Sequence, residues 1–287
     1  MALTNNPNKT KSIEKRWNQE ISVRWSRFFA AISNLPLSSL ITNLDDEEED
    51  EVNIFLLAFS SLANQILLSD NGGEWQNKYQ TITYGRSAER AANEAKSLLS
   101  AEEISVIFLF SAIADLTILP ANRNELNFLH GRANDKLTGW IELLKQDAKS
   151  IVHDNFGKLS RDQIIALLKV RLDVTASRAR MIATTEITQA AQRAVTIQAQ
   201  EIEASLGEEV NVRWITVRDS KVRHLHAGWH GKVFTPKQAE INMNISPWNC
   251  RCGLKTVVAN RDPARLEAKF AAERKILLAR ESKNLAK

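Results

Sequence analysis

The side chains in this sequence that could hold a metal ion gather in one short segment near the C-terminus. Three of the five histidines, His224, His226 and His230, lie there together with both cysteines, Cys250 and Cys252. Zinc prefers thiolate sulfur and imidazole nitrogen, and a structural zinc site takes four such ligands at the corners of a tetrahedron. The two cysteines and two of these histidines would therefore complete a structural zinc site.

The spacing of the cysteines is also compatible with roles that involve no metal. Common zinc ligand pairs have two to four residues between them, whereas Arg251 alone separates Cys250 from Cys252 and closes a tighter chelate ring. The same pair could be buried thiols without a metal, or could serve another role. A disulfide between residues so close in sequence would be strained, so we expect reduced thiols and folding in the cytoplasm.

The histidines likewise fit a role that requires no metal. They lie in a basic loop, with Arg223 just before the first and Lys232 after the last, and could be polar surface residues. Alternatively, His226 could hydrogen-bond Asp219 and fix the loop. Both interpretations stay open beside the zinc site.

A small mixed module should position these side chains. Val212, Trp214 and Thr216 alternate with the residues between them, and a period of two is typical of a half-buried strand. Residues 252–258 predict a closing strand. The glycines at 228 and 231 indicate a loop between the two strands, which Asp219 and the serine after it would open with a turn.

The chain before this module predicts helices only. Apolar side chains recur at helical spacing, and no strand pattern interrupts them. The expected helices cover residues 52–70, 76–99, 102–119, 126–153, 160–172 and 175–206. Ser160 and Gln163 have the spacing of a capping box, Pro120 should stop a helix, and Gly207 should end the longest one.

These patterns predict an α+β fold, with a mainly α-helical N-terminal body and a small C-terminal mixed α/β module. The expected divisions are a helical region with an acidic run (1–72), a helical body (73–206), the mixed module (207–258) and a basic helix (259–287). Two apolar stretches, residues 52–68 and 104–119, are too short and too polar to span a membrane, and the N-terminus does not resemble a secretory signal.

Charge is distributed unevenly along the chain. Residues 1–30 carry six basic against two acidic side chains, residues 258–287 carry eight against four, and residues 207–257 also carry eight against four. Because the net charge is +4, residues 31–206 are acidic, with a dense run at residues 45–51. Basic ends suit contact with nucleic acid or an acidic partner, although the same charges could serve solubility alone.

The order of polar residues in the module resembles that of a known family. The pattern is Trp214, Asp219, Arg223, His226 and Gly231, followed by Pro247, Asn249, Cys250, Arg251 and Cys252. It resembles the phage Mu protein F-like family, a phage head morphogenesis domain. Upstream, the helix around Glu186 is similar to that family's, although Thr184 stands where an arginine is usual and Gln192 where an asparagine is usual. The resemblance covers roughly residues 75–258.

The resemblance implies a minor capsid protein of a tailed bacteriophage that acts in head morphogenesis at the portal vertex. It implies a location in the virion, in the capsid interior or at the portal vertex, after synthesis in the host cytoplasm. The expected partners are the portal protein, other capsid or scaffold proteins and double-stranded DNA bound without sequence specificity, with no membrane. We expect no catalytic activity.

A metal-dependent nuclease or toxin-like enzyme is the principal alternative, because loops with histidine, asparagine and cysteine occur in HNH-type nucleases. Such a site uses a further histidine after its asparagine, and no histidine follows His230. The zinc-deaminase signature also fails, because His226 stands where its His-x-Glu motif needs a glutamate, and Pro247 is not followed directly by a Cys-x-x-Cys motif. A free DNA-binding regulator is a third alternative, although no helix-turn-helix or zinc-finger spacing supports it.

Overall fold

The computed structural model of the chain describes residues 7, 9–35, 46–69, 74–100, 120–155, 158–217, 219, 221–245, 247–258, 261 and 264–285. Contacts divide the chain into two compact units. The first contains Met1–Glu14, Tyr79–Leu129 and Thr184–Lys287, and the second contains Lys15–Lys78 and His130–Ala183. The helix expected over residues 102–119 and the expected division at residues 72 and 73 lie outside the described residues.

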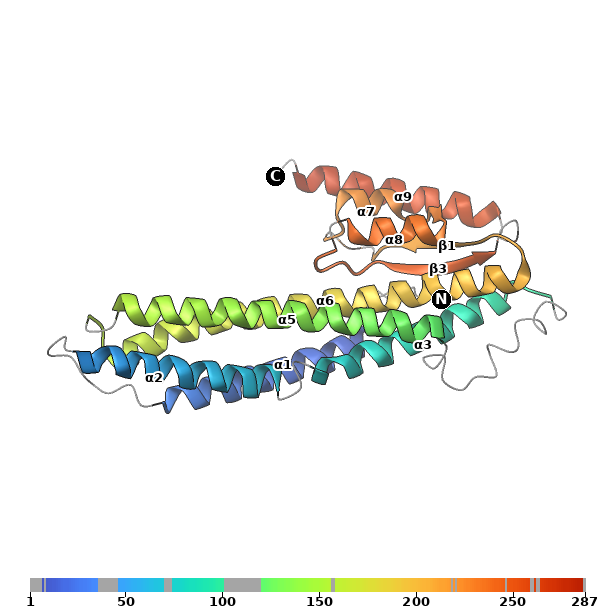
Figure 1. Cartoon of the computed structure of the whole chain (residues 1–287). Coiled ribbons are helices and arrows are strands. Elements are labelled where there is room, and N and C mark those ends of the chain that lie inside the picture. Colours follow the sequence, from blue (N-terminus) through green and yellow to red (C-terminus); the bar gives the residue numbers. More distant parts are fainter. Residues whose placement is uncertain are drawn as a thin grey trace. The chain divides into compact units, whose positions relative to one another are not determined.

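The described elements confirm an α+β fold in which helices come first and a small sheet follows (Figure 1). The helical part consists of α1 (Lys11–Ser33), α2 (Asp46–Leu62) with a π-helical continuation (Ala63–Leu68), a 3-10 turn (Glu74–Gln76), α3 (Asn77–Lys96), α5 (Pro120–Asn155) and α6 (Arg161–Leu206). The C-terminal part consists of β1 (Val210–Ile215), α7 (His224–Trp229), β2 (Val233–Phe234), α8 (Pro236–Asn244), β3 (Gly253–Val258) and α9 (Ala264–Leu285).

The second unit is a helical core. On α1, the buried side chains of Trp17, Ile21 and Phe28 recur at multiples of three or four residues, which places them on one face of the helix. The ring of Phe28 meets that of Phe59 on α2 edge to face, with centroids 5.1 Å apart. This interior is apolar and aromatic, and no predicted site residue belongs to it.

The start of α6 follows the predicted capping box, but its continuation differs from the prediction. The N–H of Ser160 donates to Gln163 Oε1 at 2.8 Å, and the N–H of Gln163 donates to Ser160 Oγ at 3.4 Å. The two helices expected over residues 160–206 are one helix. Thr175, expected to open the second, instead donates its hydroxyl to the carbonyl of Arg171 at 3.0 Å, a bond that a helix interior tolerates.

The sheet of the first unit has the order β2-β1-β3, and both pairings are antiparallel. Val212 pairs with Phe234 on one side, and Val210 pairs with Val258 on the other. Both strands expected from the sequence are therefore confirmed. The short strand β2 was not predicted.

The core of the first unit lies where the sheet meets helices. Buried residues of α3, α6, the strands and α8 form one cluster, and Figure 1 shows β1 and β3 running alongside α6. Its members include Trp214 on β1, Leu254 on β3 and Met243 on α8. Both cysteines belong to the same cluster, so the candidate metal ligands lie at the edge of this core.

Two details of the module correct the sequence-based expectations. Arg213, expected on the solvent side of a half-buried strand, is buried because α9 covers that face: its Nη1 donates to the Gly231 carbonyl at 2.7 Å and to Glu267 Oε1 at 2.8 Å. Gly228, expected in a loop, lies within α7. Gly231 does lie in a turn, with φ of +77°.

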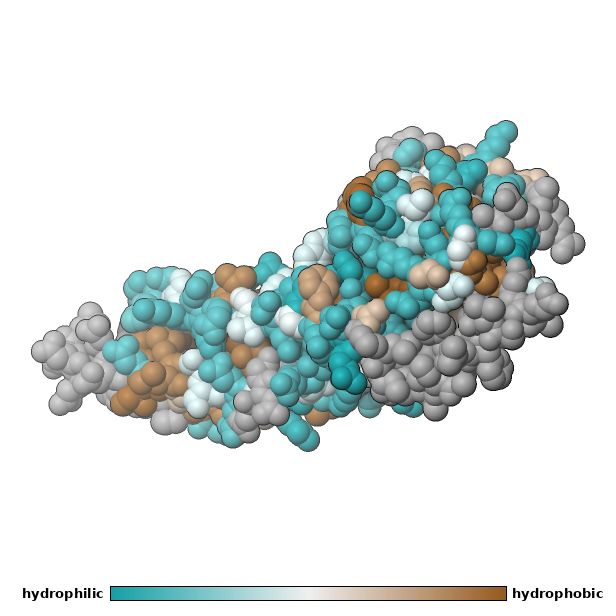
Figure 2. All heavy atoms as spheres, turned by 45° about the vertical axis from the view of Figure 1, so that its right-hand side comes forward, coloured by the Kyte–Doolittle hydropathy of each residue, from teal (hydrophilic) through white to brown (hydrophobic). Residues whose placement is uncertain are grey.

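Among the described residues, every helix is either too short or too polar to cross a bilayer. The helix expected from residue 52 begins earlier, at Asp46, so residues 46–51 of the acidic run form the first turns of α2, where carboxylates are favourable. In the space-filling view, hydrophobic residues form separate patches within a mostly hydrophilic surface (Figure 2).

Candidate functional site

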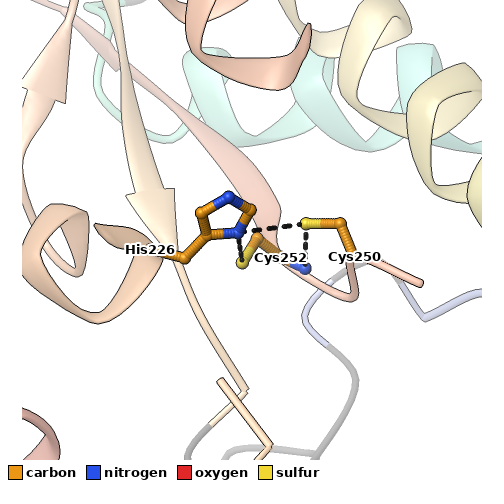
Figure 3. A group of neighbouring side chains, drawn as sticks. All are labelled: His226, Cys250 and Cys252. Carbon is orange, nitrogen blue, oxygen red and sulfur yellow. Dashed lines mark hydrogen bonds between the residues drawn. The ribbon is translucent and has the colours of Figure 1, made fainter. Parts of the chain in front are cut away.

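Two segments of the first unit, α7 and the turn before β3, bring together His226, Cys250 and Cys252 (Figure 3). His226 is on α7, and Cys252 immediately precedes β3. Cys250 closes a turn in which its N–H donates to the carbonyl of Pro247 at 3.1 Å. Asn249 occupies the left-handed region in that turn, with φ of 53°, a conformation that asparagine tolerates better than most residues.

The three side chains converge on a common point. His226 Nδ1 lies 3.5 Å from Cys250 Sγ and 3.5 Å from Cys252 Sγ, and all three ligand atoms lie within 4.8 Å of one another. Zinc–sulfur bonds of about 2.3 Å and zinc–nitrogen bonds of about 2.0–2.1 Å in a tetrahedron place nitrogen and sulfur about 3.6 Å apart. The two distances from His226 Nδ1 to the sulfurs therefore match the nitrogen–sulfur edge of a tetrahedral zinc site.

The orientation of the imidazole is fixed by its second nitrogen. His226 Nε2 lies 3.2 Å from the carbonyl oxygen of Ile245, which can only accept a hydrogen bond. In the neutral ring Nε2 therefore carries the proton, and the lone pair of Nδ1 faces the two sulfurs. Asp219, which the sequence offered as an alternative partner of His226, instead binds Arg251.

Aromatic side chains surround the imidazole. The ring of Trp229 stacks on that of His226 with centroids 5.2 Å apart and planes at 19°. Trp214 meets the same ring edge to face, with centroids 5.6 Å apart. Because His226 and Trp214 are both buried, this packing leaves the imidazole little freedom to rotate away from the sulfurs.

The two thiols hold their protons with unequal strength. The hydrogen bond from Cys252, assisted by His226, lowers the pKa of Cys250 to about 5 although burial opposes the shift. Burial raises the pKa of Cys252 well above its usual value, and the neighbouring Cys250 sulfur raises it further. At neutral pH the pair therefore favours one thiolate and one thiol, which repel each other less than two thiolates would.

The structure places the other two histidines outside this cluster. His224 is exposed on α7. His230 is fully buried, and its Nδ1 accepts from the N–H of Thr216 at 3.1 Å while Nε2 lies 3.0 Å from Glu273 Oε2. Because Nδ1 accepts, Nε2 carries the proton and donates to the carboxylate. His230 therefore fastens α9 to the module, and nothing in the sequence spacing indicated Glu273 as its partner.

The charged motif residues hold the segments that carry the cysteines. Both terminal nitrogens of the Arg251 guanidinium donate to the Asp219 carboxylate, at 2.6 and 2.9 Å. This contact lowers the pKa of Asp219. Asp219 also accepts from the N–H of Lys221 at 3.0 Å, which shapes the turn. Arg223 donates to the carbonyl of Trp248, and this bond ties the start of α7 to the cysteine turn.

Helix α6 supports the same turn from its buried face. Gln192 Nε2 donates to the carbonyl of Cys252 at 2.9 Å, and the N–H of Asn249 donates to Thr185 Oγ1 at 3.0 Å. Gln192 thus makes a side-chain hydrogen bond at the position where an asparagine is usual in the phage Mu protein F-like family. Glu186 is fully buried beside them, 3.5 Å from Gln80 Nε2 on α3.

A small hollow adjoins the three candidate ligands. It has a volume of about 10 Å³, and all three ligands line it together with Val217, Lys221, Val222, Arg223, Asn249 and Arg251. A volume of about 10–15 Å³ is what one water molecule requires. The hollow therefore has room for a single small ligand and is far below the several hundred Å³ of a typical substrate pocket.

Comparison with known proteins covers the helix and the module that form this site. Residues 157–255, about a third of the chain, match the family described as phage Mu protein F like protein. No curated protein and no solved structure matches the chain. The matched segment begins just before α6, ends within β3 and contains the motif residues from Glu186 to Cys252. Over this segment, the chain is similar to the phage Mu protein F like family, as the order of its motif residues indicated.

Proposed function

We propose that the chain is a minor head protein of a tailed bacteriophage that acts in head morphogenesis at the portal vertex. The observation that carries the proposal is the family match over residues 157–255, which includes α6, β1, α7, β2, α8 and the start of β3. We expect a head protein to present a rigid surface to its neighbours. The motif residues should therefore stabilise the fold of the module.

The contacts of the motif residues support a structural role. Asp219 and Arg251 bind each other, and Arg223 binds a backbone carbonyl, so their charges are used within the module. Gly231 and Trp214 are required by packing. The hollow beside the cysteines is too small for a nucleotide or a peptide. We therefore assign no catalytic step to these residues.

The proposed partners are the portal protein, other capsid or scaffold proteins and packaged DNA. Helix α9 supports the DNA contact, because Lys269 and Lys275 are exposed on it and residues 258–287 carry a net positive charge. Phosphate neutralisation by such side chains is independent of sequence and weakens as salt rises. It would let the protein touch DNA of any sequence inside a head.

Quantitative mass spectrometry of purified virions and procapsids tests the head assignment. The copies of this chain per particle are compared with the copies of the portal protein in the same sample. We expect between a few and some tens of copies per particle. Particles that lack the chain altogether, while containing the portal protein, would refute the proposal.

DNA contact is tested separately, by binding of the full chain to duplex DNA at several salt concentrations. The double variant Lys269→Gln/Lys275→Gln should bind more weakly and show a shallower salt dependence, by about two phosphate contacts. Lys149→Gln, on an exposed position of α5 in the acidic part of the chain, is the matched control and should leave binding unchanged. Equal affinities for all three proteins would exclude α9 as the DNA contact.

A further inference from the structure

We propose that His226, Cys250 and Cys252 bind one zinc ion through three protein ligands, and that a water molecule completes the tetrahedron from the adjoining hollow. This inference does not depend on the head-protein assignment. It concerns a site whose geometry is set by contacts within one unit of the fold.

The distances support a common centre between the three atoms. Nδ1 of His226 is equally far from both sulfurs, at 3.5 Å, close to the edge of about 3.6 Å that zinc imposes. The two cysteine sulfurs are soft ligands, and the imidazole nitrogen is intermediate. This set favours zinc over magnesium, calcium or manganese, which prefer oxygen ligands. The ligand set therefore favours zinc over these three hard cations.

Contacts beyond the ligands are those that a metal-bound histidine requires. Metal-binding imidazoles almost always donate their second N–H to a carbonyl or carboxylate, and Ile245 supplies this acceptor for His226. On the sulfur side, the N–H of Cys252 lies 3.5 Å from Cys250 Sγ. These two contacts hold the imidazole of His226 and the sulfur of Cys250 in the orientation that a shared metal ion needs.

Charge balance also favours a cation at this position. Both cysteines are buried, and two thiolates placed side by side away from water are strongly unfavourable. A zinc ion with two thiolates and a neutral imidazole has no net charge. Zinc would therefore balance the charge of the two sulfurs and would cross-link α7 to the segment before β3.

The fourth position is open within the described part of the chain. His230 is bonded at both ring nitrogens, to Thr216 and Glu273, and Asp219 is bonded to Arg251. The group of potential ligands around the site accordingly contains three residues. All three line the hollow of about 10 Å³, which accommodates one water molecule.

The first test measures metal content in the full chain purified without added metal, by elemental mass spectrometry. We expect about one zinc per chain in the native protein. His226→Gln, Cys250→Ser and Cys252→Ser should each lower that content at least about tenfold. His224→Gln is the matched control, because His224 is exposed on the same helix two residues away, and it should retain the metal. Native protein without zinc that also fails to bind added zinc would overturn the proposal.

The second test works on the native protein alone, and so does not depend on the variants being folded. X-ray absorption at the zinc edge should report two sulfur neighbours at about 2.3 Å and two nitrogen or oxygen neighbours at about 2.0–2.2 Å. A third sulfur or a second imidazole would overturn the water-completed site. A Cys250–Cys252 disulfide, detected by mass spectrometry of native protein kept under the reducing conditions of the cytoplasm, would overturn zinc binding itself.

Discussion

The backbone of Gly231 lies directly against the side chain of Phe270. A Cβ placed on Gly231 would stand 2.2 Å from Phe270 Cβ and 2.6 Å from Cγ, and Gly231 has φ of +77°. Substitution by alanine should therefore destabilise the protein through both a clash and a strained backbone, by about 2–4 kcal/mol. Urea denaturation of Gly231→Ala against the native chain measures this loss.

Gly228 provides the matched control for that substitution. It lies three residues earlier, within α7, and a Cβ there would meet no atom within 4 Å. Because alanine favours helix more than glycine does, Gly228→Ala should leave stability unchanged or raise it by up to about 1 kcal/mol. Equal effects of the two substitutions would contradict the packing of α9 on this turn.

The buried pair of His230 and Glu273 should contribute to stability through its hydrogen bond. Glu273→Ala would leave the imidazole N–H of His230 without this acceptor, a loss of about 1–3 kcal/mol. Glu273→Gln retains an oxygen that can accept and should lose less. Lys269→Ala, exposed on the same helix, serves as the control. Chemical denaturation of the three variants provides the comparison, and a fully stable Glu273→Ala would refute this role.

The contact between Gln192 and the carbonyl of Cys252 should hold the cysteine turn on α6. Gln192→Ala would leave that buried carbonyl unpaired and should reduce the free energy of unfolding by about 1–3 kcal/mol, despite the high helix propensity of alanine. Gln200→Ala, at an exposed position of the same helix, should be neutral or slightly stabilising. The prediction fails if thermal unfolding shows no difference between the two.

The pair of Asp219 and Arg251 predicts a definite pH dependence. Arg251 lowers the pKa of Asp219 in the folded chain, so the folded state favours the ionised carboxylate. The stabilisation is therefore complete above the ordinary carboxyl pKa of about 3.9, and it is lost as pH falls below that value through the lowered pKa. Because both side chains are partly exposed, its size should be about 0.2–1 kcal/mol.

Asp219→Asn should show this dependence directly. The difference in stability between native and variant proteins should be present at pH 7 and should decrease as pH falls below about 3.9, when measured by urea denaturation across a pH series. A difference that is the same at both pH values would mean that the carboxylate's charge is not what stabilises the turn.

Acid should release the proposed zinc. Protons compete for the two thiolates and the imidazole, so the affinity for zinc falls as pH falls. Dialysis of the native protein at decreasing pH, followed by elemental analysis, should show loss of zinc together with a lower melting temperature at the same pH. Zinc that stays bound at a pH well below 4 would require ligands other than His226 and the cysteines.

Local patterns could be predicted correctly from the sequence because their causes are local. The capping box of Ser160 and Gln163 depends on two residues three apart, and Gly207 ends α6 with the positive φ that glycine permits. Helix α8 carried a signal of the same kind that the prediction missed. Thr235 caps it by accepting from the N–H of Gln238, and Pro236 occupies its first turn.

Other features depend on contacts that sequence spacing does not contain. The buried position of Arg213 follows from coverage by α9, which begins some fifty residues later. Likewise, only the folded chain shows that His226 lies beside the cysteines. His230 instead makes a hydrogen bond with Glu273. The two histidines are four residues apart in one short segment, and spacing alone treats them as equivalent.

The sheet order β2-β1-β3 makes the first strand to be synthesised the central one. Val210 can pair with Val258, its partner in β3, only after 48 further residues have been added, and ribosomes add about 5–20 residues per second. For some seconds the nascent chain therefore presents a finished strand with a free edge. Translation that stops before Gly253 should leave that edge open for pairing with other copies, so that truncated products aggregate instead of forming a smaller folded protein.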